Sequence, residues 1–196
     1  MKKIKTIFFG SGDFAVPLLE VLAAADFIDL SAVVSQPDKP VGRKKVLTPV
    51  PVVKYAREEL DVEIFQPKLY RGAEKEILEA IKPDLIIVAD YGQILPKLTI
   101  EYPQYKCLNV HASMLPKYRG AVPMPIAILN GDKVTGVSIP IMTEGLDDGP
   151  VVADLEYRLD GQETTASLTT ILAQKGAELL IQIIPAWVRG EIEVVD

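Results

Sequence analysis

Polar side chains alternate with apolar ones in the short stretch Leu108-Asn109-Val110-His111. Residues two apart on a strand face the same way, so Asn109 and His111 share one face, which Ser113 would continue. Polar groups on a buried strand are costly without partners. A neighbouring amide and imidazole can both donate to an oxygen that gains negative charge, and the imidazole can also move a proton. The pattern predicts a catalytic pair for group transfer or, alternatively, a hydrogen-bonded core pair.

A second polar feature is the glycine-flanked turn 145–149, which carries Asp147 and Asp148. A carboxylate beside His111, the single histidine of the sequence, would orient its ring and favour its charged form. Asp and Gly also favour exposed turns, so the spacing leaves open whether this turn reaches the strand. Cys107 is the single cysteine, which excludes an internal disulfide and a cysteine-based zinc site, and we expect no metal.

The first glycine-rich segment, Gly10 to Ala15, matches the G-x-G-x-x-A form of the dinucleotide-binding fingerprint. Such a site also needs an acidic residue after the second strand, where this sequence reads Val34-Ser35-Gln36. An NAD(P)-binding oxidoreductase is therefore a disfavoured alternative. The other interpretation is a tight strand-to-helix turn whose glycines permit close packing.

These residues need a scaffold, and strand and helix signals alternate through the first 90 residues. Apolar, β-rich runs predict strands at 6–9, 28–34, 62–65 and 85–89. Helical spacing predicts helices at 14–25, capped by Asp13, at a segment ending at Leu60, and at 74–81. Four prolines between 36 and 51 predict an irregular segment. The fold class predicted is α/β, Rossmann-like, with a mostly parallel sheet and helices on both faces.

The second half of the sequence is less regular. We expect a further central strand at 108–111, a helix at 121–129, strands at 134–142 and 151–158, and a closing helix at 164–188 that kinks or breaks at Pro185. The length of 196 residues fits one domain. No apolar run approaches 18 residues and no signal peptide is recognisable, so we expect no membrane-spanning helix and a cytoplasmic protein.

Charge is distributed unevenly. The net charge is −6, yet the stretch from Lys39 to Arg57 carries six basic residues and no acidic one. Its prolines would order the loop in advance, so Arg43, Lys44 and Lys45 would be presented at lower entropic cost. A compact basic segment on an acidic body indicates a local anionic partner.

Several ordered motifs together resemble the N10-formyltetrahydrofolate-dependent formyltransferases, and most of all the catalytic domain of the methionyl-tRNA formyltransferases. The resemblance extends over essentially the whole chain. It is carried by the blocks Phe9 to Phe14, Gln36 to Arg43, Ala89 to Pro96, Asn109 to Gly120, Thr135 to Val137 and Gly145 to Asp147.

The resemblance implies the roles of individual residues. Asn109, His111 and Asp147 would transfer the formyl group, without a metal. The first turn, with Gly12 and Phe14, would lie by the formyl acceptor. The folate donor would be bound by the loop Thr143 to Gly149 and by Tyr91, Gly92, Gln93, Ile94, Leu95, Pro96, Ser113, Met114, Leu115 and Pro116.

The acceptor implied by the basic loop is methionyl-tRNA, whose acceptor arm would meet Arg43, Lys44 and Lys45. An amino sugar, a nucleotide amine or a non-catalytic tRNA-binding module remain alternatives. We expect a monomer that does not bind membranes. The family's tRNA enzymes carry a C-terminal β-barrel domain, which we expect this chain, ending at Asp196, to lack.

Four positions depart from the family pattern. Asp90 stands where a small residue is usual, and Asp148 stands where Thr is common. Pro125 and Ile126 replace a pair that is usually polar and basic.

Overall fold

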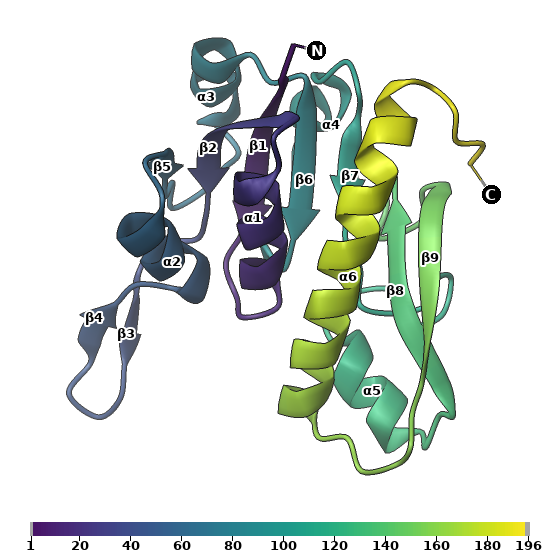
Figure 1. Cartoon of the computed structure of the whole chain (residues 1–196). Coiled ribbons are helices and arrows are strands. Elements are labelled where there is room, and N and C mark those ends of the chain that lie inside the picture. Colours follow the sequence, from purple (N-terminus) through teal and green to yellow (C-terminus); the bar gives the residue numbers. More distant parts are fainter. Residues whose placement is uncertain (1, 195–196) are drawn as a thin grey trace.

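A parallel sheet forms the centre of the molecule (Figure 1). The computed structural model describes residues 2–194. The sheet has five strands in the order β5-β2-β1-β6-β7, with all neighbours parallel. The order places β1 centrally, so the chain crosses over on both sides of it. Its strands are β1 (Ile4–Gly10), β2 (Ile28–Val34), β5 (Glu63–Phe65), β6 (Leu85–Ala89) and β7 (Cys107–Asn109). The predicted Rossmann-like α/β class is confirmed.

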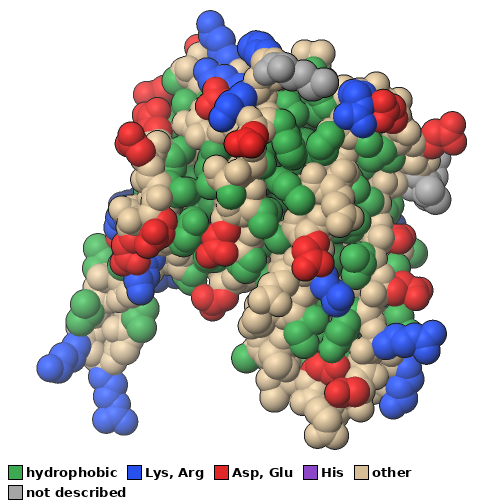
Figure 2. All heavy atoms as spheres, in the orientation of Figure 1, with side chains coloured by type: hydrophobic (Ala, Val, Ile, Leu, Met, Phe, Trp, Pro, Cys, Tyr) green, Lys and Arg blue, Asp and Glu red, His purple; other side chains and the backbone are tan. Residues whose placement is uncertain are grey.

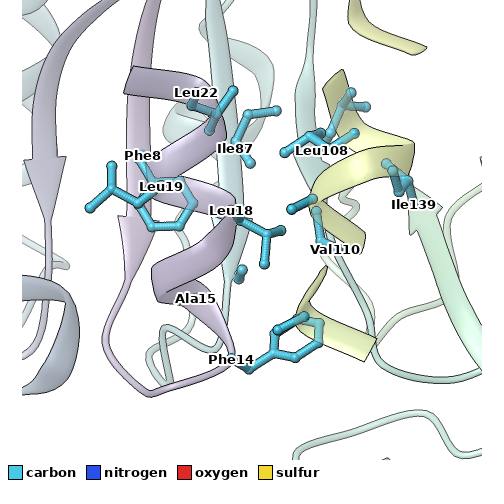
Figure 3. Close-up of a cluster of buried hydrophobic side chains, with 14 of the residues drawn as sticks. Phe8, Phe14, Ala15, Leu18, Leu19, Leu22, Ile87, Leu108, Val110 and Ile139 are labelled. Carbon is cyan, nitrogen blue, oxygen red and sulfur yellow. The ribbon is translucent and has the colours of Figure 1, made fainter. Parts of the chain in front are cut away.

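Helices cover both faces of this sheet. One face packs on α1 (Ala15–Ala24), α2 (Pro51–Glu59) and α6 (Thr165–Val188). The other face packs on α3 (Glu74–Ile81) and α4 (Lys97–Glu101). Alternate strand residues therefore enter different cores, as Phe8 and Ile87 do on the α1 side (Figure 3) and Phe9 and Val88 do on the other. Strands buried on both faces explain the continuous apolar runs of the sequence.

The second half of the chain adds the helix α5 (Pro123–Leu129) and an antiparallel ribbon of β8 (Val134–Pro140) and β9 (Val151–Arg158). The ribbon runs antiparallel to β7, through bridges from Leu108 to Ile141 and from His111 to Ser138. The strand expected at 108–111 lies between β6 and this ribbon, and only its bounds differ, because its regular parallel pairing with β6 ends at Asn109.

The sequence predicted an irregular proline-rich segment, but part of this segment has regular structure. It forms an exposed hairpin of β3 (Lys39–Val41) and β4 (Val46–Thr48). Pro40 lies opposite Leu47, and proline is tolerated in such an isolated pair because no central ladder needs its missing N–H. Gly42, with φ of 71°, helps to reverse the chain at the tip. The hairpin projects from the body and carries basic side chains at its end (Figures 1 and 2).

Helix boundaries correct three further expectations. No side chain caps α1, whose N-cap is Phe14, so the predicted Asp13 cap is wrong. Pro51 opens α2 instead of belonging to the irregular segment, since the first turn of a helix has free N–H groups anyway. Pro185 lies inside α6, in its last turn, and the helix continues to Val188, so the helix does not break there.

The sequence has no long apolar run, so we expected no helix that could span a membrane. By length and composition alone, however, α6 is long and apolar enough to do so. In the structure its buried residues belong to the core that α1 and the ribbon share with it. Gly176 is buried in this helix, and a Cβ there would lie 3.1 Å from Cγ1 of Val110. The missing side chain thus lets α6 approach the segment that carries Asn109 and His111.

Candidate active site

A cavity of about 820 Å³ opens at the carboxyl ends of the parallel strands. In open α/β sheets this is where ligands bind, at the point where the strand order reverses. Here that point lies between β1 and β6. The walls come from segments far apart in the sequence: residues 12–14, 88, 90–95, 100, 109–112, 120–125, 140–148, 165 and 169.

Asn109, His111 and Asp147 meet in this cavity. Oδ1 of Asp147 accepts a hydrogen bond from Nδ2 of Asn109 (3.2 Å). Its Oδ2 lies 3.8 Å from Nδ1 of His111, and the two side chains are only 14% and 7% exposed. The structure thus answers the question that the sequence left open, because the glycine-flanked turn does reach the strand.

The His111 ring is fixed from behind. Its Nε2 lies 3.0 Å from the carbonyl oxygen of Tyr118, which can only accept, so Nε2 carries a hydrogen. The main chain of His111 exchanges two hydrogen bonds of 2.9 Å with Ser138 in β8. The tautomer inferred from these contacts leaves Nδ1, on the side of Asp147, as the nitrogen free to take or give a proton.

Tyr118 is a supporting residue to which sequence reasoning gave no role. Its hydroxyl donates to Asp132 (2.8 Å) and accepts from Asn130 (2.9 Å). Lys117 lies 2.8 Å from the same carboxylate, and together with Tyr118 it lowers the pKa of Asp132. The sequence carried no signal for this role, because Tyr118 contacts the His111 ring through its backbone carbonyl.

Left-handed backbone conformations cluster at the site. Asp90, Tyr118 and Asp147 have φ of 47°, 58° and 46°. Such values are uncommon for residues other than glycine, and Asn and Asp tolerate them best. Strained residues of this kind collect at functional sites, where the surrounding structure holds them in place.

The two neighbouring carboxylates of the turn have different surroundings. Asp147 points to Asn109 and also accepts from the backbone N–H of Gly120 (2.8 Å). Asp148 accepts from the hydroxyl of Thr143, and its carboxyl group fills the space where a side chain on Gly145 would lie. Asp147 therefore belongs to the group around His111, while Asp148 holds the turn itself.

The structure brings part of the expected folate site to the cavity. Tyr91, Gly92, Gln93, Ile94 and Leu95 line it, as do Thr143 to Asp148, whereas Pro96 and Gly149 do not. The loop is anchored by Gln36, a residue without a predicted role, whose Nε2 donates to the carbonyl of Tyr91 (2.7 Å). Burial raises the pKa of the Tyr91 phenol, so its hydroxyl stays protonated.

Of the residues expected to contact folate, four lie outside the lining of the cavity: Ser113, Met114, Leu115 and Pro116. The chain turns away after Ala112. Ser113 is fully buried and donates to the carbonyl of Lys117 (2.6 Å), and the N–H of Leu115 donates to Ser138 (3.0 Å). This segment shapes the turn that carries the carbonyl of Tyr118.

The residues expected at the acceptor fall into two groups. Gly12 and Phe14 line the cavity. Arg43, Lys44 and Lys45 are exposed at the hairpin tip and are not part of its wall. Of the positions that depart from the family pattern, Asp90, Pro125 and Asp148 line the cavity and Ile126 does not. Among the described residues, no group of three or more His, Cys, Asp or Glu side chains is placed to hold a metal ion.

The sequence of this chain is similar to those of a known protein family and of curated proteins. Residues 2–184 match the family described as Formyl transferase. A curated relative, methionyl-tRNA formyltransferase of Bacillus cytotoxicus, is 45% identical over 97% of this chain and 60% of its own. The chain thus spans about 60% of the length of the curated relatives that it matches.

Solved structures share the fold. Glycinamide ribonucleotide transformylase 1 of Symbiobacterium toebii superposes with a TM-score of 0.80 at 19% identity, covering 99% of this chain and 95% of its own. An N-formyltransferase of Helicobacter canadensis, solved with folinic acid and dTDP-3-aminofucose, has a TM-score of 0.73 at 20% identity, covering 98% and 67%. The family match over nearly the whole chain, together with this fold, shows that the chain belongs to the formyl transferase family.

Proposed function

We propose that this cavity is the active site of a transferase that moves the formyl group of N10-formyltetrahydrofolate to the α-amino group of methionyl-tRNA. The observation that carries the proposal is the convergence of Asn109, His111 and Asp147 at one cavity wall. The name of the curated relatives supports methionyl-tRNA as the acceptor.

The cavity fits a folate donor. Its volume of about 820 Å³ lies within the usual range for sites of drug-sized ligands. Part of the wall is apolar, with Val88, Leu95 and Ile100, as a flat ring system requires. A bound folate supplies an activated formyl group, and the residues of this chain act on it.

Each of the three side chains has a task that its surroundings allow. When an amine attacks a formyl carbon, negative charge develops on the formyl oxygen. The Asn109 amide has one N–H engaged by Asp147 and a second one free to donate to that oxygen. His111 is held with Nε2 on the carbonyl of Tyr118, so that Nδ1, when the ring is protonated, can donate to that oxygen or pass its proton on. Asp147 orients both groups and can accept the proton that the attacking amine loses. The bond between the formyl carbon and N10 then breaks, and N10 takes up a proton as tetrahydrofolate leaves.

The exposed hairpin supports an RNA acceptor. Arg43, Lys44 and Lys45 project from the body where a polyanion can reach them without entering the cavity (Figure 2). Contacts of this type position a nucleic acid through its phosphates. A dinucleotide cofactor is disfavoured, because β2 is followed by Ser35 and Gln36, and the Gln36 amide is bound to the carbonyl of Tyr91.

The test is a comparison of acceptors. The protein is incubated with N10-formyltetrahydrofolate and, separately, with methionyl-tRNA, glycinamide ribonucleotide or an amino-sugar nucleotide. We expect formylmethionyl-tRNA as the main product, with none formed by a His111→Ala variant. Preferential formylation of either small acceptor would give this site the function of the sugar or nucleotide enzymes instead. Absence of transfer to all three would favour a non-catalytic binding module.

A further inference from the structure

The side chain of Asp90 occupies the space beside Gly12. A Cβ built on Gly12 would lie only 1.9 Å from Oδ2 of Asp90, so a residue other than glycine at position 12 would displace the carboxylate. The backbone holds Asp90 at the same turn, because its carbonyl accepts from the N–H of Ser11 (3.0 Å). Both Gly12 and Asp90 line the cavity, so the carboxylate lies in its wall.

Without this carboxylate, the turn would be suited to bind an anion. A glycine-rich turn leading from a strand into a helix exposes N–H groups, and the helix dipole adds positive potential. Here the turn leads from β1 into the ten-residue helix α1. Two carboxylates, Asp13 and Asp90, line the cavity at this point.

The surroundings of Asp90 show that the charges of this region act on one another. Partial withdrawal from water and, after it, the proximity of Asp13 raise the pKa of Asp90, while Lys39 at the start of β3 opposes the rise. The side chain is nevertheless open to solvent on one side. The turn thus presents acidic groups to the cavity, and the basic hairpin begins next to it.

We propose that Asp90 is a specificity-determining residue, whose carboxylate excludes phosphate groups from the first turn and reserves this end of the cavity for the phosphate-free part of the acceptor. The inference rests on the proposed function and refines it. The phosphates of an RNA acceptor would meet the cations of the hairpin, outside the cavity. A small acceptor that had to place its phosphate against the α1 N-terminus would be repelled.

The experiment measures phosphate binding directly. Ribose 5-phosphate and inorganic phosphate are titrated calorimetrically into the parent protein and into Asp90→Asn and Asp90→Gly variants. Asn and Gly both tolerate the left-handed backbone of this position, so the fold should be kept. Removal of a unit charge next to the bound anion should tighten ribose 5-phosphate binding at least about tenfold in both variants.

Asp148→Asn is the matched control. It removes the same charge from the wall of the same cavity, but from the turn where Asp148 bonds to Thr143. Its affinity for ribose 5-phosphate should equal that of the parent. The inference is wrong if both Asp90 variants bind ribose 5-phosphate no more tightly than the parent. It is equally wrong if Asp148→Asn gains as much, since the effect would then come from net charge alone.

The result can be separated from that of the proposed function. Formylation of methionyl-tRNA by the parent protein is measured in parallel and does not enter the titration. A parent that formylates methionyl-tRNA, with Asp90 variants that gain no phosphate affinity, would refute only the role of Asp90. A parent that fails to formylate it, with variants that do gain affinity, would refute the acceptor and leave the role of Asp90 intact.

Discussion

Nδ1 of His111 faces Oδ2 of Asp147 at 3.8 Å, while Nε2 on the other side of the ring is bound to the carbonyl of Tyr118. The ring therefore cannot turn without breaking a hydrogen bond. The carboxylate is fixed as well, because it accepts from Asn109 and from the N–H of Gly120. The three side chains thus form one connected unit, and substitutions within such a unit are not additive.

The first prediction concerns Asn109 and His111. Alanine at either position should lower kcat by about 10²–10³, the usual effect of removing a donor to an oxyanion. Folate affinity should change much less, because the hydrogen bonds removed are made mainly in the transition state. Steady-state kinetics and equilibrium folate binding give the two values. The double variant should lose far less than the product of the single effects, and an unchanged kcat in either single variant would remove that residue from the mechanism.

The second prediction separates the neighbouring carboxylates. Asp147→Asn should fold and lose most of its activity, because an amide cannot accept a proton from the amine and competes with Asn109 as a donor. Asp148→Asn should have a much smaller effect, since Asp148 bonds to Thr143 within its own turn. Turnover of both variants, with thermal unfolding as the control for folding, decides the matter. Equal losses of turnover in the two variants would contradict the assignment of Asp147 as the proton acceptor.

The third prediction concerns the hairpin cations. Replacing Arg43, Lys44 and Lys45 by alanine should weaken tRNA binding and make its dependence on log salt concentration shallower, by roughly one unit for each phosphate that the variant no longer binds. Folate binding should not change, because these side chains do not line the cavity. A control variant removes Arg71, Lys75 and Lys82, at and beside α3, which alters the net charge equally. If both triple variants behave alike in a salt series, the hairpin has no specific role.

The fourth prediction concerns the base of the hairpin. Asp38 accepts hydrogen bonds from Gln66 (2.7 Å) and Arg57 (3.3 Å), and these contacts hold its pKa below the usual value. The stabilisation by the carboxylate is thus fully present above the pKa of the unfolded chain and is lost as pH falls through the lowered pKa of the folded one. Asp38→Asn should therefore destabilise the protein at pH 7 but not near pH 2. Urea unfolding at both values tests this, and an equal difference at both would contradict it.

Local sequence patterns predicted the parallel core well. The apolar run Leu85–Ala89 and the amphipathic segment Glu74–Ile81 form β6 and α3 with the expected bounds. Each pattern arises from burial of the segment itself, so neighbouring residues contain the information. The hairpin was missed because Pro40 breaks regular structure in a central strand but not in an exposed two-stranded ribbon.

The candidate site was predictable only in part. The alternation Asn109-Val110-His111 indicated two polar groups on one face, which is a local property. The contact of Asn109 with Asp147 spans 38 residues of sequence, and the contacts of both polar groups depend on how β8 carries the following turn back to β7. The roles of Tyr118 and Gly120 were not visible, because both act through backbone groups, and any residue type has those.

The antiparallel cover that β8 provides for β7 has a consequence for association of the protein with itself. An open strand edge offers unpaired N–H and C=O groups to other chains and is a route to aggregation. The main-chain hydrogen bonds of His111 with Ser138, and that from Met142 to the carbonyl of Cys107 (2.8 Å), close this edge of the sheet. At the opposite margin, β5 has only three residues, one of which is the exposed Glu63. The main-chain bonds that place His111 thus also close this edge of the sheet to pairing with another chain.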